Sequence, residues 1–352
     1  MKTGEDVYSY NNQMIVPRGS VLDDKMITRL EFYSVLAVRI ADEEGDGEEA
    51  VPAGEQEIIN TTAYSEKVKN SKQFKKFEKS FLETTEDFKS RFTDIAENGS
   101  EINSREMIDS ITGLVSDDGT GPSVFDMLHN MRQYDDLTYM HSMNVALICN
   151  VFAKWLGMSK EEIDILTLGG LLHDIGKLKI PDNIIRKPDK LSPAEYNIIK
   201  THPLQGYNIL KDKNIDENVK QCALMHHERC DGSGYPLGVT SDKINRYAKI
   251  VSIADVYDAM TAARVYRGPL CPFKVIGIFE SEGLHKYDGH YILTFLEHIA
   301  TTYMNNRVRL NNGMEGDVIF MNRNQYSRPM LQCGDKFIDL SREPELYIET
   351  FV

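Results

Sequence analysis

The 352-residue sequence lacks several features that would assign it to common classes of protein. It has no run of about 18 apolar residues, so no membrane-spanning helix is expected. No basic segment followed by an apolar one opens the chain, and therefore no secretory signal is predicted. The five cysteines form no C-x-x-C pair, which favours free thiols in a reducing cytoplasm.

The chain also lacks a surplus of basic residues. Its 54 acidic residues outnumber 40 lysines and arginines, and the net charge is −14. Proteins that wrap long nucleic acid need a basic surface, so this class of partner is excluded. A small phosphate ligand is still compatible with the charge, because bound divalent ions can reverse the sign of a site.

Composition and periodicity divide the chain into five parts, and together they predict a mainly α protein. The parts are a small α+β N-terminal unit, an acidic linker, a helical connecting region, an all-helical catalytic domain and a short β-rich C-terminal extension. Their expected bounds are residues 1–41, 42–60, 61–122, 123–304 and 305–352.

Local patterns support this division. Residues on both sides of Asn11-Asn12 carry a hairpin signal in the N-terminal unit. The phenylalanines from Phe74 to Phe88 are spaced by three, four and seven residues, which predicts a helix with a buried aromatic stripe. Capping-box sequences begin at Ser159 and Ser192, ahead of predicted helices in the catalytic domain.

The nine histidines fall into two classes. Four have no partner pattern and are interpreted as structural or surface residues: His129, His285, His290 and His298. The other five lie at helix ends or on apolar helix faces together with two aspartates: His141, His173, Asp174, His202, His226, His227 and Asp255. One such histidine alone would usually be a core residue. The combination indicates a metal site, because imidazole and carboxylate are metal ligands and are costly to bury unpaired.

The contexts of these residues explain how they can converge. Asp174 follows His173 near the end of an apolar helix, and its two oxygens can bridge two ions. His226 and His227 point about 100° apart on a helix. They can serve one cluster only if the helix ends there, as the glycines from Gly232 onward indicate. The spacing therefore supports a metal-dependent phosphohydrolase.

The sequence around these residues resembles the HD-GYP family, a subgroup of the HD phosphohydrolase superfamily. The resemblance covers roughly residues 123–304, about half of the chain. It is carried by three stretches, which are His173–Lys177, His226–Pro236, and Ala254–Thr261 with Arg264, Tyr266 and Arg267. It implies an all-helical catalytic domain, two or three iron or manganese ions, and hydrolysis of cyclic di-GMP to pGpG or GMP.

The resemblance also implies roles for individual residues. The seven histidines and aspartates named above match the metal ligands, with Asp174 bridging the ions, and Asp174 and Lys177 match catalytic groups. Expected substrate contacts are Lys177, Arg264, Tyr235, Gly234 and Asp231. Tyr235 either stacks on guanine or packs within the protein. Members with three metals have a glutamate four residues before the first histidine; Leu137 stands there, so two ions are expected.

Three other functions remain open for a protein that we expect to be cytoplasmic. They are an HD phosphohydrolase for another nucleotide such as a dNTP or ppGpp, a non-catalytic cyclic di-GMP receptor, and a module that binds diguanylate cyclase (GGDEF) domains. The sequence does not choose the metal, the final product or whether the chain forms a homodimer. Three roles remain open for the N-terminal unit and the β-rich extension: sensing, dimerisation or bracing of the core.

Overall fold

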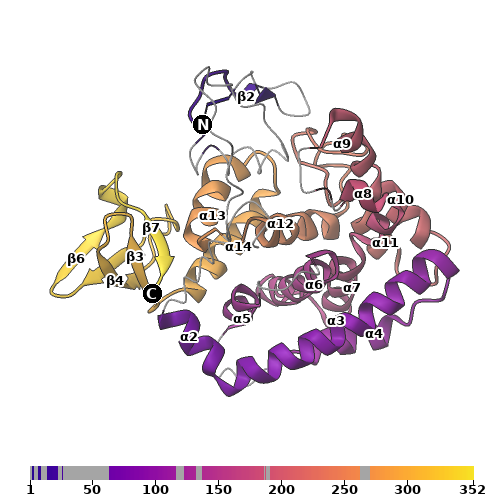
Figure 1. Ribbon diagram of the computed structural model, residues 1–352, viewed down its shortest axis with the longest axis horizontal. Coiled ribbons are helices and arrows are strands. Elements are labelled where there is room, and N and C mark those ends of the chain that lie inside the picture. The colour runs from indigo at the N-terminus through magenta and orange to yellow at the C-terminus, as the bar shows by residue number, and fades with distance from the viewer. Residues whose placement is uncertain are drawn as a thin grey trace, which may run out of the picture.

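The structure, a computed structural model, consists mainly of helices (Figure 1). It describes residues 2–3, 7–8, 14–22, 26, 63–115, 123–131, 137–185, 187, 191–261 and 270–352. Helices make up most of the described residues between 63 and 302, and an antiparallel sheet follows them. The predicted mainly α class with a β-rich C-terminal part is therefore confirmed. None of the helices within these ranges has the length and apolar character needed to cross a lipid bilayer.

Two short strands pair in the N-terminal unit. β1 (Val7–Tyr8) and β2 (Met14–Val16) are antiparallel, as the hairpin signal predicts, and Val7 lies opposite Val16. The acidic linker expected at 42–60 falls outside the described residues.

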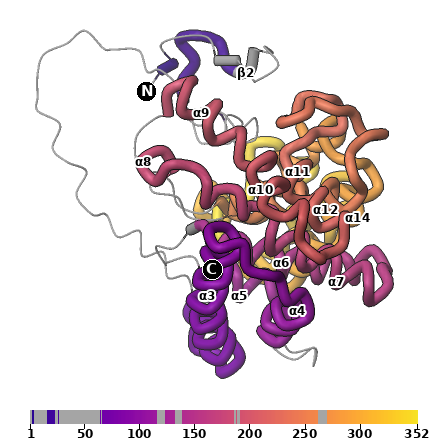
Figure 2. The backbone as a smooth tube through the Cα atoms, turned by 90° about the vertical axis from the view of Figure 1, so that its right-hand side faces the viewer, coloured from indigo at the N-terminus to yellow at the C-terminus, as the bar shows by residue number. Residues whose placement is uncertain are grey.

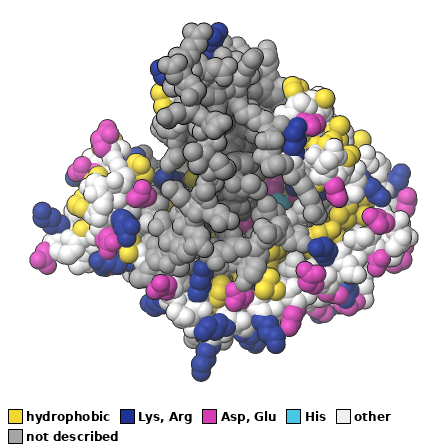
Figure 3. Space-filling view, in the orientation of Figure 1, with side chains coloured by type: hydrophobic (Ala, Val, Ile, Leu, Met, Phe, Trp, Pro, Cys, Tyr) yellow, Lys and Arg dark blue, Asp and Glu magenta, His cyan; other side chains and the backbone are white. Residues whose placement is uncertain are grey.

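The connecting region is built around the long helix α3 (Lys72–Asn98), which is flanked by α2 (Ala63–Asn70) and α4 (Ser104–Thr112). Ser71 caps α3 by accepting a hydrogen bond from Phe74 N at 3.1 Å. The predicted aromatic stripe is buried, and each buried ring contributes about 1.5–3 kcal/mol. Its members are Phe74, Phe77, Phe81 and Phe88. Charged side chains cover the outer face of α3, along the lower edge of Figure 3.

The central domain is a set of helices between residues 124 and 302. Their bounds are α5 (Val124–Asn130), α6 (Leu137–Trp155), α7 (Lys160–Leu172), η1 (Ile175–Lys179), α8 (Asp182–Ile185), α9 (Pro193–Ile199), α10 (His202–Leu210), α11 (Glu217–Met225), α12 (Arg246–Thr261), α13 (Pro272–Ile278), η2 (Phe279–Gly283) and α14 (Gly289–Thr302). Both predicted capping boxes are present, at Ser159 and Ser192. Helices α10, α11 and α12 lie side by side (Figure 2), and α7 packs against α6, α11 and α12.

A five-stranded antiparallel sheet completes the chain. Its strands are β3 (Arg307–Leu310), β4 (Glu315–Phe320), β5 (Met330–Cys333), β6 (Lys336–Asp339) and β7 (Ile348–Phe351), in the spatial order β6-β5-β4-β3-β7. One face is apolar and buried, as the period of two in a strand requires, and it includes Val308, Val318 and Leu331. Asn305, with a φ of 64°, turns the chain from α14 into β3.

The packing of η1 on α10 yields a first prediction. A Cβ at Gly176 would lie 2.0 Å from His202 O and 2.4 Å from Gly206 N, which are backbone atoms that cannot move independently. Gly176→Ala is expected to lower the free energy of unfolding by about 1–3 kcal/mol or more, measured by thermal unfolding followed by circular dichroism. The control is Gly289→Ala, whose Cβ would meet nothing within 4 Å. Equal melting temperatures for the two variants would contradict the prediction.

Candidate metal centre

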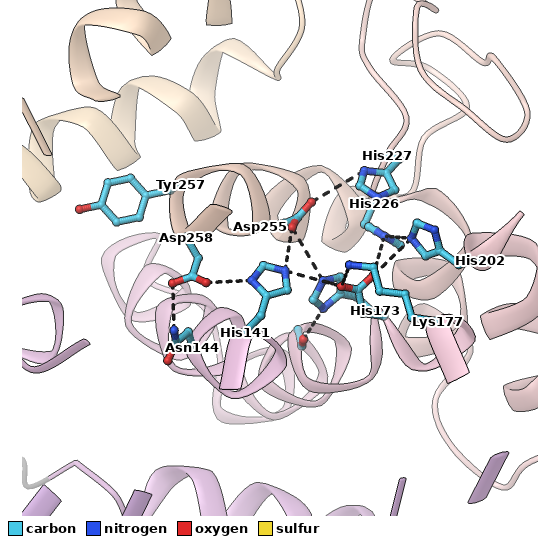
Figure 4. Close-up of polar contacts among 12 residues, drawn as sticks. His141, Asn144, His173, Lys177, His202, His226, His227, Asp255, Tyr257 and Asp258 are labelled. Atoms are coloured by element: carbon cyan, nitrogen blue, oxygen red, sulfur yellow. Dashed lines mark hydrogen bonds and ion pairs between the residues drawn. The ribbon is translucent and has the colours of Figure 1, made fainter. Parts of the chain in front are cut away.

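All seven predicted ligand residues lie in one cluster, and they come from five segments (Figure 4). α6 supplies His141, the end of α7 supplies His173 and Asp174, α10 begins with His202, the end of α11 supplies His226 and His227, and α12 supplies Asp255. Five of the seven thus lie at a helix terminus or in the turn that follows one. This is where a chain can change direction and aim side chains inward. The sequence patterns predict that these residues lie at helix ends, and the structure brings them together.

Asp174 lies at the centre of the cluster, and its two oxygens face different histidines. Oδ1 is 3.2 Å from His202 Nε2 and 3.6 Å from His226 Nε2. Oδ2 is 3.3 Å from His173 Nε2 and 3.6 Å from His141 Nε2. The cluster therefore contains two sets of ligand atoms that share Asp174: a first group of His141, His173 and Asp174, and a second group of Asp174, His202, His226 and His227.

Asp255 approaches both groups from α12. Its Oδ1 is 3.0 Å from His141 Nε2 and 3.9 Å from His173 Nε2, so it adds a carboxylate to the first group. Its Oδ2 is 3.8 Å from His227 Nδ1 in the second group. The two carboxylates together touch every imidazole of the cluster.

Backbone carbonyls fix the orientation of three of the rings. In His173, His202 and His226 the Nδ1 atom donates to the carbonyl oxygen three residues earlier, at 2.7, 2.7 and 3.0 Å. Because a carbonyl oxygen only accepts, Nδ1 carries a proton, and in the neutral ring Nε2 then keeps its lone pair. Each Nε2 points at Asp174. The unpaired carbonyls at the helix ends thus select the tautomer that a metal ligand requires.

A carboxylate orients the fourth ring, that of His141. Its Nδ1 lies 2.8 Å from Asp258 Oδ2, and Asp258 Oδ1 accepts a hydrogen bond from Asn144 Nδ2 at 3.1 Å. Asn144 lies one turn beyond His141 on α6, and Asp258 lies one turn beyond Asp255 on α12 (Figure 4). A histidine held by a carboxylate behind it is typical of metal sites.

Charges in the cluster match those that metal binding needs. Burial opposes ionisation of Asp174, but the ammonium of Lys177 and the adjacent ring of His173 outweigh it and hold the pKa of Asp174 well below its usual range. Burial lowers the pKa of His226 to about 4 and that of His227 well below its usual value. At neutral pH the cluster therefore offers the carboxylate anion of Asp174 and the neutral imidazoles of His226 and His227.

Three buried polar atoms of the cluster have no hydrogen-bond partner among the described residues. They are His173 Nε2, Asp174 Oδ1 and His227 Nδ1. Burying such atoms unsatisfied costs about 1–3 kcal/mol each. All three lie within the two groups of ligand atoms, where one cation or more would satisfy them. Imidazole and carboxylate donors together fit a divalent metal ion.

The expected catalytic and substrate residues take different places. Lys177 forms an ion pair with Asp174 Oδ2 at the edge of the cluster, where a quarter of its side chain is exposed. Asp231 is exposed and accepts a hydrogen bond from Ser233 N at 2.9 Å. Arg264 lies outside the described residues, as does the side chain of Leu137, the first residue of α6.

The ring of Tyr235 stacks on His227, with centroids 4.7 Å apart and an interplanar angle of 28°. Burial raises the pKa of the Tyr235 hydroxyl well above its usual range. Of the two options that the sequence leaves open for this ring, these contacts favour packing within the protein. Gly234 lets the loop pass close to the ligand segment, since a Cβ there would lie 2.5 Å from His227 O.

Glu228 holds this loop in place, and the sequence analysis did not single it out. Its side chain is buried and accepts hydrogen bonds from the backbone N–H groups of Leu237 at 2.6 Å and Val239 at 3.2 Å. The two bonds close the loop that carries Tyr235. The sequence did contain a signal for this role. An acidic residue directly follows His226-His227 and precedes a glycine-rich loop, whose exposed backbone N–H groups lie within its reach.

Comparisons with known proteins relate this region to an enzyme family. Residues 126–291 match the family model of the HD domain. The cyclic di-GMP phosphodiesterase PA4108 of Pseudomonas aeruginosa is 31% identical over 64% of this chain and 53% of its own length. The 3′3′-cGAMP-specific phosphodiesterase 1 of Vibrio cholerae is 42% identical over 41% of this chain and 34% of its own length.

A third relative is the cyclic di-GMP phosphodiesterase response regulator RpfG of Xanthomonas campestris pv. campestris. It is 43% identical over 34% of this chain and 32% of its own length. This chain thus spans about half or less of the length of the curated relatives it matches.

The protonation of His141 yields a prediction about pH. Burial lowers its pKa, but the hydrogen bonds to Asp255 and Asp258 outweigh burial and raise the pKa to about 9. A metal must displace this proton, so the apparent Kd for Mn²⁺ should fall about tenfold per pH unit between pH 7 and pH 9. Calorimetric titrations at several pH values measure this slope. In Asp258→Asn the pKa of His141 should be lower, so the Kd should stop falling at a lower pH. A Kd that does not change with pH in the unmodified chain would refute the account.

Proposed function

We propose, on the premise that residues 126–291 of this chain belong to the HD-GYP family of HD domains, that the chain is a metal-dependent phosphodiesterase for a cyclic dinucleotide. The proposed substrate is cyclic di-GMP, and the proposed products are pGpG and GMP. One observation carries the proposal: a buried carboxylate, that of Asp174, is divided between two sets of imidazoles. Two metal ions held by such ligands would stabilise the attacking and the leaving oxygen when a phosphate diester is cleaved.

We propose two ions, iron or manganese. The first group of ligands with Asp255 would hold one, and the second group would hold the other, with Asp174 between them. Such ions, when bound, lower the pKa of a coordinated water and so supply hydroxide near neutral pH. Leu137 supports the number two, because it occupies the position where family members with three metals have a glutamate.

The chain's own residues would bind and orient the substrate. Lys177 is partly exposed next to Asp174, so its ammonium can offset charge on the phosphoryl oxygens in the transition state. Arg264 is proposed to bind a phosphate through two parallel hydrogen bonds. Asp231 and Gly234, in the loop that Glu228 closes, are proposed to line the substrate pocket.

A second candidate substrate, 3′3′-cGAMP, is supported by the relative of Vibrio cholerae that is specific for it, which is 42% identical over 41% of this chain. The chemistry at phosphorus would be the same, and only the base at one end would differ. We propose cyclic di-GMP first because PA4108, whose match covers 64% of this chain, is a cyclic di-GMP phosphodiesterase. A non-catalytic receptor, or a module for GGDEF domains, would bind its partner without hydrolysis.

The proposal predicts turnover that depends on Asp174. Protein purified without oxygen and loaded with Fe²⁺ or Mn²⁺ should convert cyclic di-GMP to pGpG or GMP, measured by chromatography beside 3′3′-cGAMP, ppGpp and dNTPs. Asp174→Ala should lower kcat/KM more than about a hundredfold, because loss of even an outer partner of a metal ligand costs about 10–100-fold. The control is Asp164→Ala, which removes a half-buried carboxylate that pairs with Lys160 away from the cluster.

Two results would contradict the proposal. Binding of cyclic di-GMP without turnover in the metal-loaded protein would identify a receptor. Full activity in Asp174→Ala, with unchanged circular dichroism, would mean that the shared carboxylate is not part of the catalytic centre.

A further inference from the structure

The side of α12 that faces away from the cluster is in contact with the C-terminal part of the chain. Asp255 and Asp258 lie one turn apart and point toward the histidines, whereas Tyr257 points the opposite way (Figure 4). Tyr257 is 2% exposed and packs edge-on against Phe125 and Phe295, with centroids 5.8 and 5.2 Å away. α12 therefore lies between the candidate metal centre and an aromatic cluster.

Tyr303 joins this aromatic cluster to the sheet. Its hydroxyl group shares a hydrogen bond of 3.0 Å with the hydroxyl group of Tyr257, and both side chains are buried. Tyr303 is the C-cap residue that follows α14, and the turn at Asn305 leads from there into β3. Asn305 N also donates to Val318 O of β4 at 2.8 Å, so the junction is tied to the sheet.

Phe351 of β7 closes the same junction from the other side. It is 4% exposed, although it lies on an edge strand of the sheet. Its ring centroid is 5.0 Å from that of Tyr303, 5.4 Å from that of Tyr64 on α2 and 6.0 Å from that of Phe273 on α13. Opposite Phe351 in the sheet is Val308, five residues after Tyr303. The sheet thus holds Tyr303 from two directions.

We propose that Tyr303 and Phe351 are positioning residues that set the placement of Asp255 and Asp258 through Tyr257. This inference rests on the metal site of the proposed function and assigns to the C-terminal sheet a role in building it. A ligand must be held to within about 0.5 Å of its productive position. Asp255 and Asp258 both contact His141, so a small rotation of α12 would change both contacts together.

The opposing interpretation is that the sheet stabilises the fold and has no particular influence on the cluster. The two interpretations differ in one measurable quantity, the affinity for metal under conditions where every variant is folded. General loosening lowers the melting temperature and leaves that affinity unchanged. Positioning changes the affinity even when the melting temperature shifts little.

Tyr303→Phe is the principal test, because it removes the hydrogen bond to Tyr257 and keeps the ring. Phe351→Ala removes the contact with Tyr303, and Leu331→Ala is the matched control. Leu331 is fully buried on β5, which β4 and β3 separate from β7, so its truncation loosens the sheet at a distance from the junction. Trp155, the single tryptophan, reports through its fluorescence whether each full-length variant is folded.

The Kd for Mn²⁺, measured by calorimetry well below the melting temperatures, should rise about threefold to tenfold in Tyr303→Phe and Phe351→Ala. It should stay within about twofold of the unmodified chain in Leu331→Ala. Unchanged Kd values in folded Tyr303→Phe would overturn the inference, and so would equal losses in all three variants. If the unmodified chain binds Mn²⁺ but hydrolyses no cyclic dinucleotide, the proposed function fails while the positioning role is still decided; no Mn²⁺ binding at all would overturn both.

Discussion

The burial of one carboxylate governs the architecture around it. Asp174 is 1% exposed, and an anion in that position is tolerated only if charges and donors surround it. Lys177 and the rings of His173 and His202 lower its pKa in the structure. Most of these groups come from different helices, which must end or pass within a few ångströms of one point. The convergence of α6, α7, α10, α11 and α12 is therefore a requirement of the site as much as a result of apolar packing.

Helix ends solve the problem of orienting the imidazoles. The carbonyls of a helix interior already accept backbone hydrogen bonds, but several in its last turn do not. His173 and His226 use such carbonyls in α7 and α11, and His202 uses that of Ile199 at the end of α9. His141 lies inside α6, where carbonyls are occupied, and it needs Asp258 from another helix instead. The position of each histidine in its helix thus decides whether a backbone carbonyl or a carboxylate accepts the hydrogen bond from its Nδ1.

Much of the candidate site could be predicted from the sequence because its signals are local. A His-Asp pair after an apolar helix, or two histidines before a glycine-rich loop, is visible within about ten residues. The contact between Asn144 and Asp258 could not be predicted from a local pattern, since 114 residues separate them. A β-rich C-terminal extension was predictable from the sequence, but the spatial order of its five strands was not. The return of Phe351 to Tyr303 depends on packing against α2 and α13, which no short pattern encodes.

The placement of ligands at helix termini has a consequence for the local unfolding of these helices. Isolated helix ends fray independently and exchange their amide protons quickly. Here the last turns of α7 and α11 and the first turn of α10 all hold side chains that meet at Asp174. A bound ion would act as a common cap for three helices, so these turns would open together or not at all. Segments far apart in the sequence would then share one cooperative opening event and one rate of hydrogen exchange.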